Sequence, residues 1–175
     1  MTTTIDGSNS VTINSGAILG ITSGTAVAST SGTSIDFTSL PAWVKRITVM
    51  FNEVSGNASS SLLIQLGTGS TSYTTSGYLS TGSIMVSPNS VGGGSSTAGF
   101  FINRDSAAYV VSGHMVLTNI SGNIWISSHY GKVNTSSTIN GGGSVTLGAV
   151  LTAVRITTVN GTDTFDAGSI NILYE

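Results

Sequence analysis

Apolar and polar residues alternate with a period of two along most of this chain, in short segments rich in β-branched and aromatic side chains. In the segment 47–54, Ile47, Val49 and Phe51 fall on one phase, and mainly polar residues fall on the other. This period places alternate side chains on opposite faces of a β-strand. The segments expected to be strands are 33–37, 47–54, 62–66, 77–80, 84–86, 100–103, 114–120, 124–129, 144–150, 154–159 and 169–174.

The same pattern argues against helices. No window of a dozen residues places apolar side chains at helical spacing, and Ser, Thr and Gly disfavour helix interiors. Short strands with frequent turn signals predict an all-β fold, an antiparallel β-sandwich of the jelly-roll type over residues 25–175. The residues predicted for its interior are Ile47, Val49, Phe51, Leu62, Ile64, Leu66, Met115, Leu117, Ile156, Ile170 and Ile172.

Polar and glycine-rich breaks separate the predicted strands. The break at Asn160-Gly161 and the break 120–123 are each expected to be a tight turn between antiparallel strands. The three-glycine runs 92–94 and 141–143 are expected to be flexible loops. The alternative, a phosphate cradle, would require a following helix and a nearby lysine.

Composition narrows the classes of function. The chain has 23 Gly, about 30 Ser and about 25 Thr, only 7% charged residues and a net charge of −2. So few Lys and Arg argue against nucleic-acid binding through phosphate neutralisation. The absence of Cys excludes disulfides and thiolate zinc sites. No apolar run is long enough to cross a membrane, and residues 1–5 lack the features of a secretory signal.

Residues 1–24 form a separate N-terminal segment, in which apolar residues are scattered among turn residues. A piece this short cannot build its own core, so we expect it to pack on the sandwich, to pair with copies of itself or to dock on another protein. The alternative is a disordered leader. A homotrimer would bury its apolar residues along a central axis. The residues expected to make these docking or trimer contacts are Ile5, Val11, Ile13, Ile18, Leu19 and Ile21.

Candidate chemistry is sparse. His114 and His129 fall on adjacent predicted strands and could meet at a metal, but ordinary hydrogen-bonded or exposed histidines are the simpler interpretation. Asp163 and Asp166 could serve glycoside hydrolysis or bind calcium, yet loop carboxylates beside glycine are commonly turn caps. We therefore expect no catalytic residue, no metal site and no cofactor.

Aromatic residues offer the remaining contact candidates. The side chains that could stack on sugar rings are Trp43, Trp125, Tyr73, Tyr78, Tyr109 and Tyr130. Tyr73 and Tyr78, in the Ser/Thr/Gly-rich stretch 67–82, are candidates for glycan or receptor contact because loops at the end of a sandwich often carry recognition. Trp43 and Trp125 are expected to pack in the core or between subunits. The basic residues expected to form ion pairs or hydrogen bonds to carbonyls are Arg46, Arg104, Lys132 and Arg155.

Several stretches resemble a module that recurs in tailed-bacteriophage fibre and virion proteins. They are GTSIDFTSLPAWVKRITVMFNEVS (32–55), SGHMVLT (112–118), IWISSHYG (124–131), the three-glycine run and the closing VRITTVNGTDTFDAGSINILYE (154–175). Together they cover most of the chain from residue 24 onward. DGSNSVTINSG near the N-terminus also resembles the strand-and-turn spacers of phage fibres. The resemblance implies a homotrimer with a thin N-terminal part and a β-rich tip.

The resemblance also implies a function and a location. It predicts a non-enzymatic structural protein on the exterior of a phage virion, a short fibre or adhesin that contacts a host glycan or protein. Residues 1–24 would dock on another virion protein. The alternative is a capsid decoration or head-fibre protein docked on the shell, because the chain has a short spacer and no extended shaft. A carbohydrate-binding lectin or a glycan hydrolase ranks third; neither nucleic-acid binding nor membrane insertion is expected.

Overall fold

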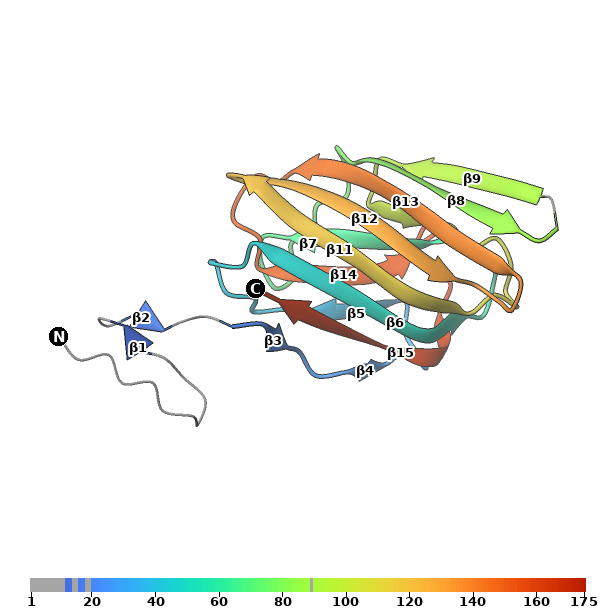
Figure 1. Ribbon diagram of the computed structural model, residues 1–175, viewed down its shortest axis with the longest axis horizontal. Helices are drawn as coiled ribbons and strands as arrows, with labels where there is room; N and C mark the ends of the chain where they lie inside the picture. The colour runs from blue at the N-terminus through green and yellow to red at the C-terminus, as the bar shows by residue number, and fades with distance from the viewer. Residues whose placement is uncertain (1–11, 14–15, 18–19, 89) are drawn as a thin grey trace.

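All regular secondary structure in the computed structural model is β (Figure 1). The structure describes residues 12–13, 16–17, 20–88 and 90–175. Among these residues no helix is long and apolar enough to cross a membrane. The prediction of an all-β, antiparallel, sandwich-like fold is therefore confirmed.

The strands range from two to eleven residues. In chain order they are β1 (Thr12–Ile13), β2 (Gly16–Ala17), β3 (Thr22–Ser23), β4 (Val27–Ala28), β5 (Ser34–Phe37), β6 (Arg46–Gly56), β7 (Leu62–Gly67), β8 (Leu79–Val86), β9 (Ser90–Ser96), β10 (Phe100–Ile102), β11 (Val111–Ser121), β12 (Ile124–Lys132), β13 (Ser137–Thr146), β14 (Ala153–Thr158) and β15 (Phe165–Tyr174).

Two antiparallel sheets form the body of the protein. The larger has nine strands in the order β3-β15-β6-β11-β12-β13-β8-β9, with β4 also paired to β15. The smaller has four strands in the order β10-β7-β14-β5 and lies behind the larger sheet in Figure 1. Strands β1 and β2 pair with each other. Side chains from the inner faces of both sheets meet in one hydrophobic core.

The core contains the residues that the sequence pattern predicts to point inward. Each of the eleven residues predicted for the interior belongs to the core, and the most exposed of them, Phe51, is only 6% accessible. Trp125 is likewise buried, whereas Trp43 is partly buried and packs at the edge of the core, its ring centroid 6.0 Å from that of Tyr174. Both tryptophans thus act in packing, as expected.

The strands differ most from the prediction in the glycine-rich parts of the chain. The segments 77–80 and 84–86 belong to one strand, β8, which continues through Gly82. The predicted strand 144–150 ends early, because β13 runs over Ser137–Thr146. Strand β9 was not predicted at all. Glycine hides each of these strands from a search for alternating apolar residues, since it carries no side chain to mark a face.

The two three-glycine runs are strand interiors, so the prediction of flexible loops is wrong. Gly94 lies in β9 beneath Phe101 of β10, and a β-carbon at position 94 would approach Phe101 Cζ to 2.6 Å. Gly143 lies in β13, where a β-carbon would come within 2.9 Å of Ser80 Cα in β8. Glycine is required here because neighbouring chain occupies the inner face of the sheet.

One of the two predicted turns joins paired strands and the other does not. Gly122, with a φ of 53°, lies in the turn of the β11–β12 hairpin, as predicted. Asn160-Gly161 instead connects β14 to β15, which belong to different sheets. There Asn160 Oδ1 accepts hydrogen bonds from the N–H groups of Thr162 and Asp163, both at 3.1 Å. The asparagine organises an Asx-type loop rather than a hairpin turn.

The N-terminal part of the described chain adds to an edge of the larger sheet. Both β3 and β4 pair with β15, and the Gly24 N–H donates to Ile172 O at 2.8 Å. Ser29 is buried and donates its hydroxyl to Ala167 O at 2.7 Å. Residues 22–29 therefore cover β15.

Candidate functional site

Six of the twelve charged side chains form three ion pairs at the surface. Arg155 makes a bidentate contact with Asp36, at 2.8 and 2.7 Å. Other exposed ion pairs join Lys132 to Glu53 at 2.7 Å and Arg46 to Glu175 at 3.2 Å. These contacts confirm the structural role predicted for the three basic residues. In the part of the chain that the structure describes, no three His, Asp or Glu side chains come together to hold a metal ion.

The two loop carboxylates serve as hydrogen-bond acceptors for neighbouring segments. Asp163 accepts from the Ser60 N–H at 3.1 Å and from Asn160 Nδ2 at 2.6 Å. Asp166 accepts a hydrogen bond from the Ser55 hydroxyl. Asp163 thus links the loop before β15 to the loop between β6 and β7, and Asp166, which lies in β15, links that strand to β6. Both carboxylates join separate segments, whereas a turn cap would bond to the backbone of its own turn.

Arg104 is a buried cross-link at the end of the sandwich where β6, β7 and β14 meet their loops. Its side chain is fully inaccessible and donates only to backbone carbonyls, which confirms the predicted fork. Burial lowers the pKa of the guanidinium, while Asp166 and Asp163 raise it. The accepting carbonyls belong to Gly56 (2.7 Å), Ala58 (2.8 Å), Ser60 (3.2 Å), Ala107 (3.2 Å) and Tyr109 (2.9 Å).

The two histidines lie on adjacent strands but on opposite faces of the larger sheet. In the register of β11 and β12, His114 pairs with Tyr130, and His129 pairs with Met115. His114 is exposed, whereas His129 is buried and neither of its ring nitrogens has a hydrogen-bond partner. Burial lowers the pKa of His129 to about 4. The two rings therefore do not face a common site.

Tyr78 is not a surface residue, so the prediction that it contacts glycan is wrong. Its side chain is 0% accessible, and its ring packs edge-on against Phe100 at a centroid distance of 5.0 Å. The Leu66 N–H donates to the Tyr78 hydroxyl at 2.8 Å. Polar neighbours in the sequence suggested a loop, but the chain here turns inward before β8 begins.

Tyr73 lies at the surface with its ring already occupied. The Arg155 guanidinium lies 4.0 Å from the ring centroid, a cation–π contact, and the phenol is half-buried. The ring also lies against Gly67, where a β-carbon would come within 3.0 Å of Tyr73 Cδ1. Little of the ring remains for stacking on a ligand.

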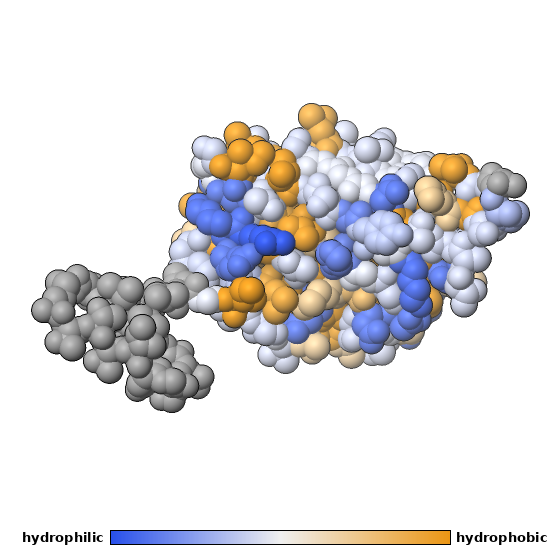
Figure 2. Space-filling view, viewed as in Figure 1, coloured by the Kyte–Doolittle hydropathy of each residue, from blue (hydrophilic) through white to orange (hydrophobic). Residues whose placement is uncertain are grey.

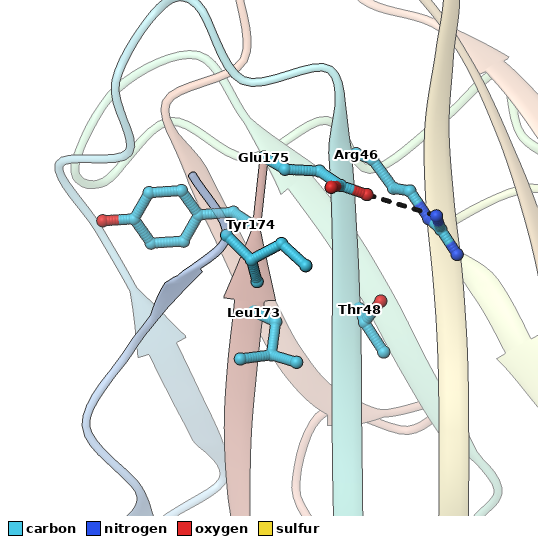
Figure 3. A pocket seen from close by; sticks show the side chains of 6 residues that line it. Arg46, Thr48, Leu173, Tyr174 and Glu175 are labelled. Carbon is cyan, nitrogen blue, oxygen red and sulfur yellow. Dashed lines mark hydrogen bonds and ion pairs between the residues drawn. The ribbon is translucent and has the colours of Figure 1, made fainter. Parts of the chain in front are cut away.

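Of the six N-terminal contact candidates, Ile21 is the one whose side chain the structure describes. Ile13 falls in β1, and Ile5, Val11, Ile18 and Leu19 lie outside the described residues. Ile21 is 68% accessible and lines a pocket of about 210 Å³ beside the C-terminus. Figure 3 shows Arg46 and Glu175 bridging the rim of this pocket, with Leu173 and Thr48 side by side below them. The pocket is lined by Ile21, Arg46, Thr48, Leu173, Tyr174 and Glu175.

Exposed apolar side chains gather at the end of the sandwich from which the chain leaves toward its N-terminus, here called the linker end. Two hydrogen bonds bring its loops together, from the Asn119 N–H to Lys45 O at 2.8 Å and from the Leu147 N–H to Asn123 O at 3.0 Å. Figure 2 shows apolar surface over the ends of β11 and β12. The exposed apolar residues there are Ile21, Leu79, Ile120, Ile124, Ile126 and Val150.

A smaller group of exposed apolar residues lies on the β8–β9 hairpin. Met85 and Val91 are cross-strand neighbours, 51% and 74% accessible, beside a groove of about 490 Å³. Strand β9 is the last strand of the larger sheet on that side. Met85 and Val91 thus form a smaller group of exposed apolar residues than the one at the linker end.

These features describe an all-β sandwich protein with a group of exposed apolar residues at one end and three ion pairs at its surface. No protein family matches the chain, and no curated protein or solved structure matches it either. Its function is therefore inferred from its own residues.

Proposed function

We propose that the chain is a non-enzymatic structural protein of the exterior of a bacteriophage virion, a short fibre or adhesin-like protein that takes part in attachment to the host surface. In this proposal it is a homotrimer. Residues 1–24 dock on another virion protein, and residues 25–175 form a jelly-roll-like domain that projects from the particle. The sequence resemblance suggests the class, and the apolar linker end supports it.

The linker end is the single observation that carries the proposal. Ile120 and Ile21 are 62% and 68% accessible there, although isoleucine gains roughly 1.5–3 kcal/mol when fully buried. Scattered apolar residues are normal on a surface, but a group of them at one end is typical of an interaction site. Three copies arranged around an axis through this end would cover the group and bring their N-terminal segments together.

The surface charge is consistent with an exposed particle component. Charged residues make up only 7% of the chain, and half of them form ion pairs that contribute little stability, about 0–1 kcal/mol each. The remaining surface is dominated by Ser and Thr. With so few Lys and Arg residues, the domain offers few cleavage sites to trypsin-like proteases outside the cell.

The location of the protein on intact particles tests the proposal directly. Cryo-electron microscopy of the phage that encodes it, with separate reconstructions of capsid and tail, should show a three-fold β domain at the tail. The same density on the capsomers would favour the alternative, a decoration protein docked on the shell through residues 1–24. Particles that lack the protein altogether would contradict a virion role.

The trimer is tested in solution with the full-length chain. Light scattering after size exclusion should give three chains per particle at micromolar concentration. Replacing Ile124 and Ile126 together by Ser should shift this mass toward the monomer, because both side chains belong to the apolar linker end. Val159→Ser is the matched control. Val159 is 50% accessible and directly follows β14, at the end of the sandwich away from the linker end. A monomeric wild-type chain would contradict the trimer.

A further inference from the structure

A row of outward-facing side chains crosses the middle of the larger sheet around Tyr130. In the register of neighbouring strands His114 pairs with Tyr130, Tyr130 with Asn140, and Asn140 with Ser83. Residues paired in this way have β-carbons about 4.5–5.5 Å apart, so their side chains share one patch of surface. The strands that carry them, β11, β12, β13 and β8, lie side by side across the front of Figure 1.

Tyr130 is the most exposed aromatic side chain of this face, at 61% accessibility. Unlike Tyr73, its ring has no cation–π partner among the described residues. It lies four residues along β12 from Ile126, outside the linker end. An aromatic ring in the middle of a sheet, flanked by polar side chains, offers an apolar platform with hydrogen-bonding groups at its edges.

The polar neighbours of Tyr130 are positioned by contacts within the sheet. Asn140 Oδ1 accepts a hydrogen bond from the Ser83 hydroxyl at 2.7 Å, which orients the amide and leaves Nδ2 as a donor. His114, on the other side of the ring, is exposed and carries both a donor and an acceptor in its neutral form. Donors and acceptors thus lie on both sides of the platform.

A groove adjoins the platform on the side of His114. Its volume is about 470 Å³, within the range of small-ligand sites. The groove is shallow over Gly113, Thr48 and Val116, whose side chains are absent or small. Its lining residues are Arg46, Thr48, Met50, Phe51, Gly113, His114 and Val116. A ligand stacked on Tyr130 could therefore continue into the groove across β11 and β6.

The charge beside the platform is neutralised. Lys132, two residues from Tyr130, contacts Glu53 at 2.7 Å, and the Ser112 hydroxyl donates to the same carboxylate oxygen at 2.9 Å. The hydrogen bond from Lys132, and to a smaller extent that from Ser112, lowers the pKa of Glu53 and keeps its carboxylate ionised. No net charge favours an anionic ligand, so the site suits a neutral one.

We infer that Tyr130, His114 and Asn140 form a binding site for a neutral hexopyranose glycan. The C–H face of a pyranose ring is apolar and packs on an aromatic ring, while its equatorial hydroxyls require donors and acceptors beside that ring. The site offers both, and its neutrality disfavours acidic sugars. This inference rests on the proposed attachment role, because it names the ligand through which the protein would contact the host. Glycan binding can nevertheless be measured on the purified chain alone.

The test is a titration of the full-length, isotope-labelled protein followed by amide chemical shifts. The probes are neutral trisaccharides of glucose, mannose and N-acetylglucosamine, with sialyllactose as the acidic comparison. At least one neutral probe should bind, with a dissociation constant on the order of 1 mM or tighter, and shift amides near residues 113–116, 128–132 and 139–142. Binding of sialyllactose alone would overturn the assignment to neutral glycans.

Matched variants locate the site. Tyr130→Ala should weaken binding at least about tenfold, whereas Tyr130→Phe keeps the platform and should bind within about threefold of wild type. Asn140→Ala should give an intermediate loss, and Val159→Ala, remote from the site, none. Unchanged circular dichroism and thermal unfolding would show that each variant is folded. Binding that survives Tyr130→Ala, or shifts confined to another surface, would overturn the site.

Failure of this inference is distinguishable from failure of the proposed function. A chain present on virions that binds none of the neutral probes at about 10 mM would overturn the glycan site and leave the virion role intact. A chain that binds a neutral probe through Tyr130 but is absent from particles would overturn the virion role and retain the site.

Discussion

The imidazole of His129 lies directly over Gly141 on the inner side of the larger sheet. The two residues are cross-strand partners in β12 and β13, and a β-carbon at position 141 would collide with His129 Cε1 and with Thr81 O of β8. Because Gly141 has no side chain, it leaves the space that the His129 ring occupies. Its partner on the next strand, Gly82, leaves space in turn for Phe101.

Gly141→Ala should therefore destabilise the protein, by about 1–3 kcal/mol in the free energy of unfolding. The added methyl group meets backbone atoms of β8 as well as the histidine ring, so no side-chain rotation alone can relieve the overlap. Urea unfolding at a fixed protein concentration measures the effect. The control is Gly148→Ala, where a β-carbon meets nothing within 4 Å and stability should change by less than about 0.5 kcal/mol. Equal stabilities for the two variants would contradict the close approach.

His129 should make the stability depend on pH. Its pKa is about 4 in the folded protein, against 6.5 for the ordinary side chain. Between these two values the unfolded chain binds a proton that the folded chain does not, so stability is lost as pH falls from about 6.5 to about 4. The slope approaches 1.4 kcal/mol per pH unit and the total is on the order of 3 kcal/mol.

The variant His129→Gln separates this contribution from that of other groups. The difference in unfolding free energy between wild type and variant should stay constant above about pH 7 and shift in favour of the variant as pH falls. The groups that line the small cavity beside His129 include no carboxylate that could stabilise its charged form. A difference that does not vary between pH 7 and pH 4 would contradict the buried, unpartnered state of the imidazole.

The sequence predicted those parts of the fold in which side chains carry the signal. Ile47, Val49 and Phe51 alternate with polar residues, and the larger sheet buries that phase. It could not predict β9, because Gly92 to Gly94 have no side chains to show a face and glycine is the usual mark of a loop. The space is required by the ring of Phe101, seven residues along the chain, but the sequence does not show that this ring folds back over Gly94.

The prediction of residues that contact a glycan or receptor has the same limit, because side-chain packing cannot be seen in the sequence. Tyr73 and Tyr78 were favoured because their neighbours are Ser, Thr and Gly, but composition does not reveal that Arg155 covers one ring and Phe100 packs against the other. Neighbouring composition does not single out Tyr130 among the aromatic residues, although it continues the alternation of β12, in which Trp125, Ser127 and His129 point inward. Extending that period by one residue would have placed Tyr130 on the outer face.

Removal of the Tyr78 hydroxyl should destabilise the protein by about 1–3 kcal/mol. Along β7, pairing with β10 stops at Ile64. The N–H of Leu66, two residues later in β7, donates instead to the Tyr78 hydroxyl. Tyr78→Phe leaves that buried N–H without its acceptor. Tyr130→Phe is the control on an exposed tyrosine and should cost less than about 0.5 kcal/mol in the same urea experiment. Equal effects would contradict the distinction between the two hydroxyls.

Arg104 should be the basic residue whose loss costs the most stability. Arg104→Met removes five donors at once, and the carbonyls of Gly56 and Ala58 would remain at the buried site without them. We expect a loss of at least about 3 kcal/mol in the free energy of unfolding, with faster hydrogen exchange in the loops 57–61 and 103–110.

The matched control is Arg46→Met, which removes one exposed ion pair to Glu175 and should cost about 1 kcal/mol or less. Arg104→Lys keeps the charge but offers three donors from a single nitrogen, which cannot reach all the carbonyls that lie around the edge of the planar guanidinium. Its stability should therefore lie closer to that of Arg104→Met than to that of wild type. If Arg104→Lys were as stable as wild type, charge rather than the fork of hydrogen bonds would hold these loops.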